Sequence, residues 1–268
     1  MRSLYRAALP LIVRRRLEIE RELSLNVCSY SGEATLPEQV ASIRSFLAYA
    51  GRPKQFTILS DGSYTGASIE LLEEIDNCVR VQRTAPKLPL RLPEKVQSYL
   101  TSHFTGKQLA LVMSLPANAP TLYTDSDVLF FPRACELADL FKAQSVSAYY
   151  LADYQFSGDE RLVRGPAERE KPVNMGFLLL FQELDWSLGL ERLQMLNDSP
   201  NFFTTQTVVH LCMHANGAVA FDPSKFVLQE DDQFTYRDRY ADSSIAMRHY
   251  VNPVRHKFWT ALARDFLK

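Results

Sequence analysis

Hydrophobic and polar positions in the first ninety residues follow two alternating periods. Short apolar runs rich in β-prone residues have the length of buried strands, and the apolar residues of the segments between them recur every three to four positions. The strands are expected at residues 25–30, 56–60 and 79–82, and the helices at 34–50 and 69–77. This order of strand, helix, strand, helix, strand predicts a parallel sheet with helices on both faces.

The pattern continues to the C-terminus. Further strands are expected at residues 121–123, 147–151, 177–181 and 219–227, and further helices at 108–115, 186–196 and 203–213. The charged segment 156–171 contains Gly158, Gly165 and Pro166, which predicts a flexible loop of the kind that often closes over an active site. No repeat or linker divides the chain, so residues 25–268 are expected to form one domain.

Residues 1–24 are expected to form an N-terminal amphipathic helix. Arg14 with Glu18, and Arg16 with Glu20, are opposite charges at helical spacing. Such a helix either packs on its own domain or uses the basic residues within 4–23 to touch an anionic membrane surface.

Composition restricts the possible classes of protein. The 268 residues are 46% hydrophobic and 23% charged, with a net charge of −1, so the chain can build a large core and has no global field for nucleic acid. The start of the chain has no signal-peptide pattern, and no stretch has the ~20 apolar residues that span a bilayer. The cysteines are widely spaced and are interpreted as reduced core thiols of a cytoplasmic protein; they are Cys28, Cys78, Cys135 and Cys212.

The stretch 122–131 carries the most informative chemistry. Apolar, β-prone residues lead directly into Asp125-Ser126-Asp127 and resume after it. Two carboxylates at the end of a buried strand are costly to leave unpaired, and a divalent cation, which prefers carboxylate oxygens, would neutralise them. An isolated Asp-x-Asp is more often a pair of solvated turn residues, so the interpretation depends on partners elsewhere in the chain.

Other polar groups fall at the ends of predicted strands. Ser29, Tyr30 and Asp61 end the first two strands, and ligands bind at the carboxyl ends of parallel strands, although each residue alone is more often part of a turn. Asn174 and Gly176 precede a buried strand, where a glycine lets the backbone approach a ligand closely. A plain turn into the strand explains this pair equally well.

The stretch 248–259 gathers two imidazoles and three cations around a prolyl turn and ends in aromatic residues. This charge density suits a diphosphate, or a metal ion together with a phosphate. The alternative is a solvated basic C-terminus.

The order of these signals resembles that of the GT-A nucleotide-sugar glycosyltransferases: strand and Asp-x-Asp, Asn-x-Gly before a strand, a glutamine at a helix start, and a C-terminal histidine followed by Lys-x-Trp. The chain is most similar to the retaining group of glycogenin and the lipooligosaccharide galactosyltransferases, the family-8-like enzymes, from about Leu25 to Trp259. The resemblance implies an α/β, Rossmann-like fold with a mixed, mainly parallel central sheet flanked by helices. It also implies metal-dependent transfer of a sugar from a nucleotide-diphosphate donor, expected to be a UDP-sugar, to a hydroxyl of a glycan, lipid or protein, with retention.

The resemblance also implies roles for single residues. Asp125, Asp127 and His249 look like the ligands of Mn²⁺ or Mg²⁺, which with Lys257 would stabilise the charge that develops on the departing diphosphate. Gln206 looks like the polar group beneath the donor sugar, so a retaining reaction would need no carboxylate base. The catalytic set is Gln206, Lys257 and Asn174, and the donor-binding set is Ser29, Tyr30, Asp61, Lys107, Asp125, Ser126, Asp127, Asn174, Gly176, Gln206, His249 and Lys257.

Two departures from the family pattern leave choices open. The family ending is His-x-x-Gly-x-x-Lys-Pro-Trp, whereas this chain has two more residues between His249 and Lys257, with Asn252 in the place of glycine and Phe258 in the place of proline. Either His249 or His256 is therefore a candidate ligand, and His249 is preferred. Thr205-Gln206-Thr207 stands where the family has Asp-Gln-Asp, which leaves the sugar's identity open.

Three other functions remain possible at this stage. An inverting transferase would need a carboxylate base, for which Glu230, Asp231 and Asp232 are candidates. A haloacid-dehalogenase-like phosphatase would use Asp125 as nucleophile and Asp127 as acid/base, but that motif normally opens a chain, and here three strand-and-helix units come first. A non-catalytic sugar-nucleotide binder would keep the fold and lose the metal site.

Overall fold

The computed structural model describes residues 1–84, 86, 88, 92–115, 119–140 and 146–266. Its contacts divide the chain into two compact units. The first unit comprises Met1–Arg83, Thr124–Ala143 and Asp222–Lys268, and the second comprises Thr84–Tyr123 and Gln144–Phe221. That residues 25–268 form a single domain stays a prediction.

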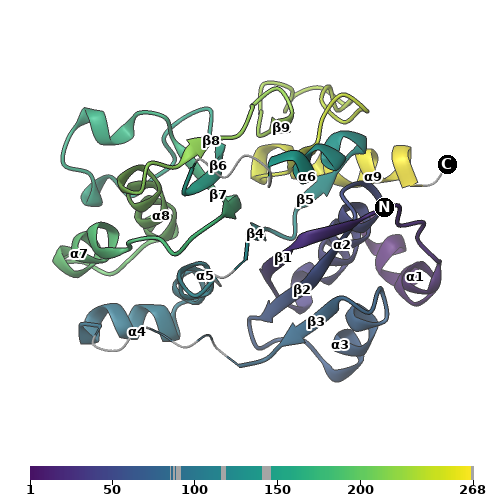
Figure 1. Cartoon of the computed structure of the whole chain (residues 1–268), viewed down its shortest axis with the longest axis horizontal. Coiled ribbons are helices and arrows are strands. Elements are labelled where there is room, and N and C mark those ends of the chain that lie inside the picture. The colour runs from purple at the N-terminus through teal and green to yellow at the C-terminus, as the bar shows by residue number, and fades with distance from the viewer. Residues whose placement is uncertain (85, 87, 89–91, 116–118, 141–145, 267–268) are drawn as a thin grey trace. The chain divides into compact units, whose positions relative to one another are not determined.

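The first unit begins with three parallel strands that lie side by side, with the second strand in the middle (Figure 1). The strands are β1 (Glu22–Ser31), β2 (Arg52–Ser60) and β3 (Val79–Gln82), and the connecting helices are α2 (Leu36–Tyr49) and α3 (Gly66–Glu73). The predicted order of elements is therefore confirmed. The apolar positions at helical spacing in α2 are fully buried, as expected for a helix on a sheet; they are Val40, Ile43, Phe46 and Leu47.

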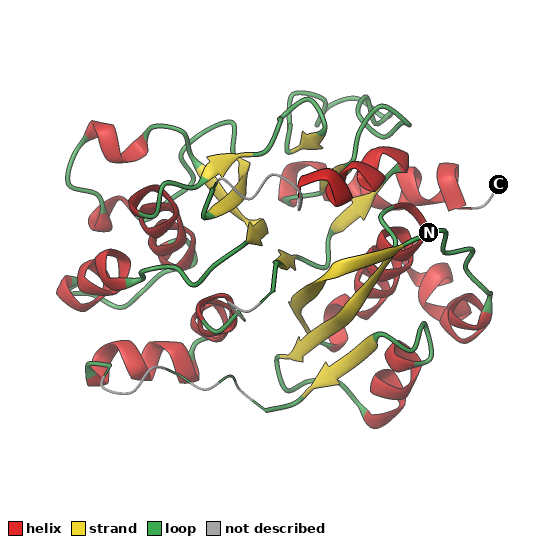
Figure 2. Cartoon of the chain, in the orientation of Figure 1, coloured by secondary structure: helices red, strands yellow, loops and turns green. Residues whose placement is uncertain are grey.

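The N-terminal segment differs from the predicted helix. The helix α1 covers only Arg2–Arg14, so the expected pairs of Arg14 with Glu18 and of Arg16 with Glu20 do not form; Arg14 instead pairs with Glu74. In residues 17–25 the apolar side chains all fall on alternate positions, which is a strand period that only Arg21 interrupts, and β1 starts at Glu22. α1 packs against α2 and α3 (Figure 2).

The first unit contains a second sheet of three strands, two of which come from the C-terminal part of the chain. Its order is β5-β10-β9, and β10 runs antiparallel to β5 and parallel to β9. The connection between β9 and β10 contains no helix or strand (Figure 2). The elements are β5 (Val128–Phe130), α6 (Leu137–Leu140), β9 (Phe226–Val227), β10 (Met247–His249) and α9 (Phe258–Phe266).

The second unit contains the remaining helices and strands, and β6 pairs antiparallel with β7 and parallel with β8. Its helices are α4 (Glu94–Ser102), α5 (Phe104–Met113), α7 (Ser187–Met195) and α8 (Thr204–Ala215), and its strands are β4 (Thr121–Thr124), β6 (Ala148–Ala152), β7 (Val173–Leu180) and β8 (Val219–Ala220). The predicted strand at 219–227 is two short strands, β8 and β9. The large sheet has seven strands in the order β3-β2-β1-β4-β7-β6-β8. The predicted fold class, a mixed and mainly parallel sheet flanked by helices, is confirmed.

The charged segment 156–171 forms two short 3₁₀ helices, Glu160–Leu162 and Pro166–Arg169. Arg192 donates hydrogen bonds to Glu168 and to the carbonyl oxygen of Leu162, so α7 holds both turns. The flexibility of this segment stays a prediction. Within the described residues, no helix has the length and hydropathy needed to cross a membrane.

Candidate metal and donor-binding site

The Asp-x-Asp motif lies in a tight connection between two buried strands. β4 ends at Thr124, the motif follows, and β5 begins at Val128. The antiparallel register of β10 places His249 opposite Val128, and the backbone N–H of Tyr250 donates to the carbonyl oxygen of Asp127 at 2.9 Å. Strand pairing thus brings together residues that are more than 120 positions apart in the sequence.

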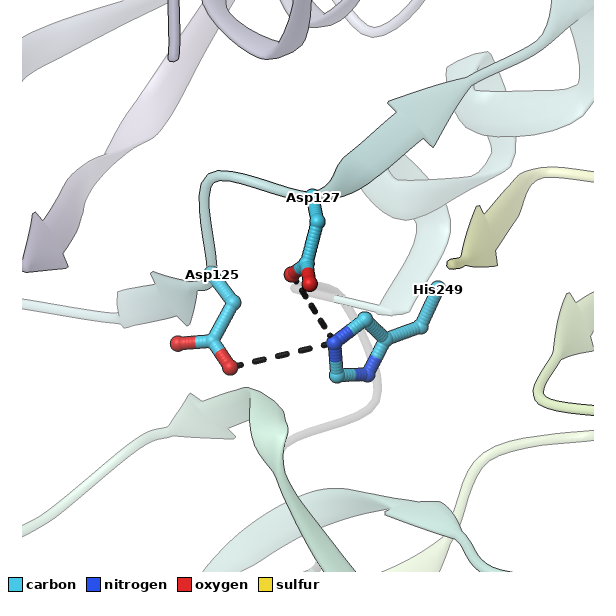
Figure 3. Close-up of side chains that lie close together, drawn as sticks. All are labelled: Asp125, Asp127 and His249. Carbon is cyan, nitrogen blue, oxygen red and sulfur yellow. Dashed lines mark hydrogen bonds and ion pairs between the residues drawn. The ribbon is translucent and has the colours of Figure 1, made fainter. Parts of the chain in front are cut away.

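The side chains of Asp125, Asp127 and His249 converge (Figure 3). The Nε2 atom of His249 lies 3.0 Å from Oδ1 of Asp127 and 3.8 Å from Oδ2 of Asp125, and one ligand atom from each residue lies within 4.8 Å of the others. Carboxylate oxygens suit Mg²⁺ and Mn²⁺, and an imidazole nitrogen completes a donor set that fits a divalent cation. The side chains are 24%, 11% and 5% exposed, so the cluster is partly screened from water.

Of the two candidate histidines, His249 belongs to this cluster. His256 lies on the exposed side of the 3₁₀ helix Asn252–Lys257 and is not part of the cluster. The geometry therefore supports the choice of His249, while metal binding itself stays a prediction.

The charges of the cluster stabilise one another. Burial disfavours the charged carboxylate of Asp127, but His249 and Arg255 outweigh burial and lower the pKa of Asp127 to about 2. Burial also disfavours the imidazolium of His249, but the negative charges of Asp127 and Asp125 raise its pKa above the ordinary value. Because a metal ion binds the neutral imidazole, the raised pKa of His249 opposes metal binding.

Arg255 is a residue of this site that the sequence interpretation missed. Its Nη2 donates a hydrogen bond to Oδ2 of Asp127. A 3₁₀ helix has three residues per turn, so Val254 and Lys257 point to one side and are buried, while Arg255 is exposed beside the carboxylates. Counting six residues onward from His249, which is the spacing of the family's lysine, identifies Arg255, whereas counting back from Trp259 identifies Lys257.

Lys257 is buried in a different place from the one expected. Its Nζ donates to the carbonyl oxygens of Thr235 and Arg237, at 2.6 and 3.0 Å, and lies 3.4 Å from Asp232. The side chain is 0% exposed, so its hydrogen-bond donors serve the loop before β10. These contacts argue against the predicted meeting of Lys257 with a diphosphate.

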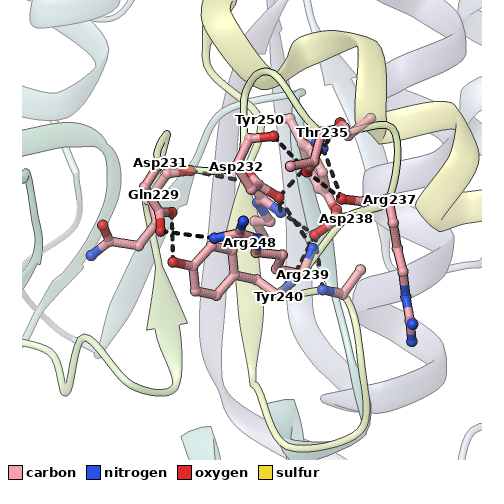
Figure 4. A network of polar contacts seen from close by, with 12 residues as sticks. Gln229, Asp231, Asp232, Thr235, Arg237, Asp238, Arg239, Tyr240, Arg248 and Tyr250 are labelled. Carbon is pink, nitrogen blue, oxygen red and sulfur yellow. Dashed lines mark hydrogen bonds and ion pairs between the residues drawn. The ribbon is translucent and has the colours of Figure 1, made fainter.

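Asp232, a candidate base for an inverting reaction, belongs to the same buried network (Figure 4). Its Oδ1 pairs with Nη2 of Arg248 at 2.8 Å, and both side chains are 0% exposed. Asp238 and Tyr250 complete the network, because Arg248 and the Tyr250 hydroxyl both donate to Asp238. A carboxylate held in this way is a structural anion and is not available as a base.

The predicted donor-binding residues at the ends of β1 and β2 differ in whether their polar groups are already used inside the protein. Ser29 is fully buried and donates to Gln39 at 2.8 Å, so its hydroxyl is used inside the protein. The Tyr30 hydroxyl is buried without a hydrogen-bond partner among the described residues, and burial, together with Asp61, raises the pKa of Tyr30 to about 12. Asp61 is exposed and accepts from Ser63. Tyr30 is therefore a neutral phenol with a free donor next to an exposed carboxylate.

The other residues predicted to bind the sugar-nucleotide donor lie in the second unit, except for Ser126, which is buried in the Asp-x-Asp turn. Asn174 is in β7, and its Oδ1 accepts the backbone N–H of Gly176 at 2.9 Å, where the pairing with β6 is irregular. Gln206 is in the first turn of α8 and donates to the carbonyl oxygen of Ser157 at 2.7 Å. Lys107 is partly exposed in α5.

The two threonines that flank Gln206 are packing residues. Thr205 is 1% exposed and donates to the carbonyl oxygen of Thr105, and Thr207 is fully buried and accepts the backbone N–H of Asp159. Short hydroxyls fit these buried positions, whereas the aspartates of the resembled family would need charged partners there.

Several glycosyltransferases of known structure share this fold. The galactosyltransferase LgtC, in complex with donor and acceptor sugar analogues, matches with a TM-score of 0.60 and 14% identity over 89% of this chain and 95% of its own. The chain has the GT-A fold. Mouse xyloside xylosyltransferase 1 matches with a TM-score of 0.54 and 13% identity over 87% of this chain and 99% of its own. An LgtC active-site mutant, with glutamine replaced by glutamate, matches with a TM-score of 0.59 and 14% identity over the same shares as LgtC. At the level of sequence, no family model and no curated protein matches the chain.

Proposed function

We propose that the protein is a metal-dependent glycosyltransferase that moves a sugar from a nucleotide-diphosphate donor, with UDP as the nucleotide, to an acceptor hydroxyl. The observation that carries this proposal is the convergence of Asp125, Asp127 and His249 directly after β4, in a fold shared with glycosyltransferases. The expected acceptor is a glycan, lipid or protein.

In the proposed reaction, Asp125, Asp127 and His249 hold Mn²⁺ or Mg²⁺, and the ion supplies positive charge to the departing diphosphate. Arg255 adds a second positive charge, because its guanidinium is exposed beside Asp127 and presents a fork of N–H donors that suits phosphate oxygens. Arg255 thus takes the role first assigned to Lys257. The neutral Tyr30 hydroxyl is a donor for a nucleotide group at the end of β1.

Retention is the proposed stereochemistry. Asp232 is held by Arg248 and Lys257, which removes one of the three candidate bases for inversion. Gln206, at the start of α8, is the proposed polar group at the donor sugar, and Asn174 and Gly176 are proposed to line the sugar and acceptor side. LgtC likewise has an active-site glutamine.

A panel of sugar nucleotides tests the proposal. In the presence of Mn²⁺, a UDP-sugar is expected to raise the thermal unfolding midpoint of the protein and to be slowly hydrolysed, since bound ligand stabilises the folded state. Neither effect is expected without the metal. Turnover of a generic phosphate ester, with no response to any nucleotide, would favour the phosphatase alternative, and nucleotide binding without any turnover would favour the non-catalytic binder.

The N-terminal helix is the proposed membrane contact of this cytoplasmic enzyme. Leu4 and Leu11 of α1 are each 76% exposed and lie two turns apart on one face, next to exposed Arg15 and Arg16. Changing both leucines to glutamate is expected to lower the affinity for vesicles containing anionic lipid at least about tenfold, because apolar area that would enter the membrane is lost and two added negative charges are repelled by the lipid. Cosedimentation measures this. Wild-type protein that remains in the supernatant with such vesicles would contradict the proposal.

A further inference from the structure

The carboxylate of Asp127 is shared between two cationic partners. Its Oδ1 faces Nε2 of His249 at 3.0 Å, and its Oδ2 accepts a hydrogen bond from Nη2 of Arg255. Asp127 is 11% exposed, so few water molecules can screen these charges. A metal ion held by Asp125, Asp127 and His249 would have to share this carboxylate with a guanidinium that is already bound to it.

Arg255 is able to leave this carboxylate. Its side chain is 52% exposed, and its only hydrogen bond within the described residues is the one to Asp127. A guanidinium has five N–H donors in a fixed fork, so most of those of Arg255 are available to an incoming anion. The contrast with Lys257, which is 0% exposed and bound to two carbonyl oxygens, shows that a cation of the same short helix can also be locked in place.

We propose that Arg255 competes with the metal ion for Asp127 and that the nucleotide diphosphate relieves this competition. Without nucleotide, the guanidinium holds Asp127 and weakens metal binding. When a diphosphate arrives, Arg255 turns to the phosphate oxygens and releases the carboxylate to the metal. Metal and nucleotide therefore strengthen each other's binding, and by linkage the effect is equal in both directions.

This competition rests on the proposed metal site. It predicts that replacing Arg255 strengthens metal binding, whereas a role of Arg255 in donor binding alone predicts no such gain. Replacing a donor-binding residue only weakens ligand binding. Removing a competitor strengthens binding of the metal alone, because one positive charge beside Asp127 is lost.

The test is the affinity for Mn²⁺ without nucleotide, measured from the electron paramagnetic resonance signal of free Mn²⁺ in a titration. Arg255→Ala is expected to bind Mn²⁺ about tenfold more tightly than wild type, as expected for removing one nearby, partly screened charge. Adding saturating UDP is expected to strengthen Mn²⁺ binding in wild type, and to do so about tenfold less in Arg255→Ala. Arg255→Lys, which keeps the charge without the fork, is expected to lie between the two.

Arg14→Ala is the matched control, because Arg14 is also an exposed arginine paired with a carboxylate, Glu74, and lies outside the cluster. It should leave Mn²⁺ binding unchanged. If wild type binds Mn²⁺ and Arg255→Ala binds it equally or more weakly, the inference fails while the proposed function stands. If neither wild type nor Arg255→Ala binds Mn²⁺, and Asp127→Asn gives the same Mn²⁺ titration as wild type, the inference fails together with the metal site.

Discussion

Replacing Asp127 with asparagine is expected to reduce sugar transfer about 10³-fold or more, since a catalytic metal ion is worth several kcal/mol of transition-state stabilisation. The change removes one negative charge from a site where Asp127 lies 3.0 Å from His249, nearer than the 3.8 Å of Asp125, and is the partner of Arg255. Asparagine has almost the same shape, so the fold should persist. The measurement is the initial rate of transfer, or of donor hydrolysis, together with Mn²⁺ affinity.

Asp222→Asn is the control for this experiment. Asp222 is exposed and accepts hydrogen bonds from Ser224 in a turn, a role that an amide oxygen can also fill. Its rate should match wild type. An Asp127→Asn enzyme that keeps its rate to within tenfold, with Mn²⁺ still required, would place the metal elsewhere.

Replacing Arg248 with alanine is expected to destabilise the protein by about 3–5 kcal/mol, because buried Asp238 loses its cationic partner and buried Asp232 loses one of its two, the other being Lys257. Arg248 is 0% exposed, pairs with Asp232 and Asp238, and lies over the rings of Tyr240 and Tyr250 (Figure 4). Arg248→Met, which keeps much of the volume, should not restore stability, since the uncompensated charges remain. Urea unfolding followed by circular dichroism measures the change in the unfolding free energy.

An exposed ion pair provides the comparison. Arg14→Ala breaks the pair with Glu74, whose side chains are 68% and 46% exposed, and should change the unfolding free energy by less than about 1 kcal/mol. Equal effects of Arg248→Ala and Arg14→Ala would mean that the buried network contributes no more than a surface pair. Arg248 precedes His249 in β10. If Arg248→Ala lowers the unfolding free energy more than Arg14→Ala does, it should therefore also weaken metal binding.

Local periodicity predicted the elements that a residue's near neighbours determine. The order of β1, α2, β2, α3 and β3 could be predicted because buried strands and one-sided helices leave different apolar spacings in the sequence. The N-terminal segment was predicted less well. Opposite charges at helical spacing in 14–22 suggested a longer helix, although the apolar residues of 17–25 already alternated with the period of a strand.

Some residues of the site could likewise be predicted from the sequence, and others could not. Asp125 and Asp127 could be selected from the sequence, because two carboxylates after a buried strand are costly to leave unpaired. His249 was preferred over His256 only through the resemblance to the family's C-terminal ending, and the geometry of the cluster supports that choice. Lys257 was selected and Arg255 was missed, since both are cations in one short segment and the family spacing fits one or the other depending on the end from which it is counted. Their roles depend on the three-residue turn of a 3₁₀ helix, which buries one and exposes the other.

The sequence by itself therefore determined the α/β order of strands and helices and the pair of carboxylates suited to a cation, because both follow from the spacing of residues along the chain, whereas the choice of histidine rested on a family resemblance. Only the tertiary structure decided which groups meet. The register of β10 against β5 brings His249 to Asp127, and the packing of the loop before β10 occupies Asp232 and Lys257. Such pairings depend on strand register and burial across more than a hundred residues, which no local pattern encodes.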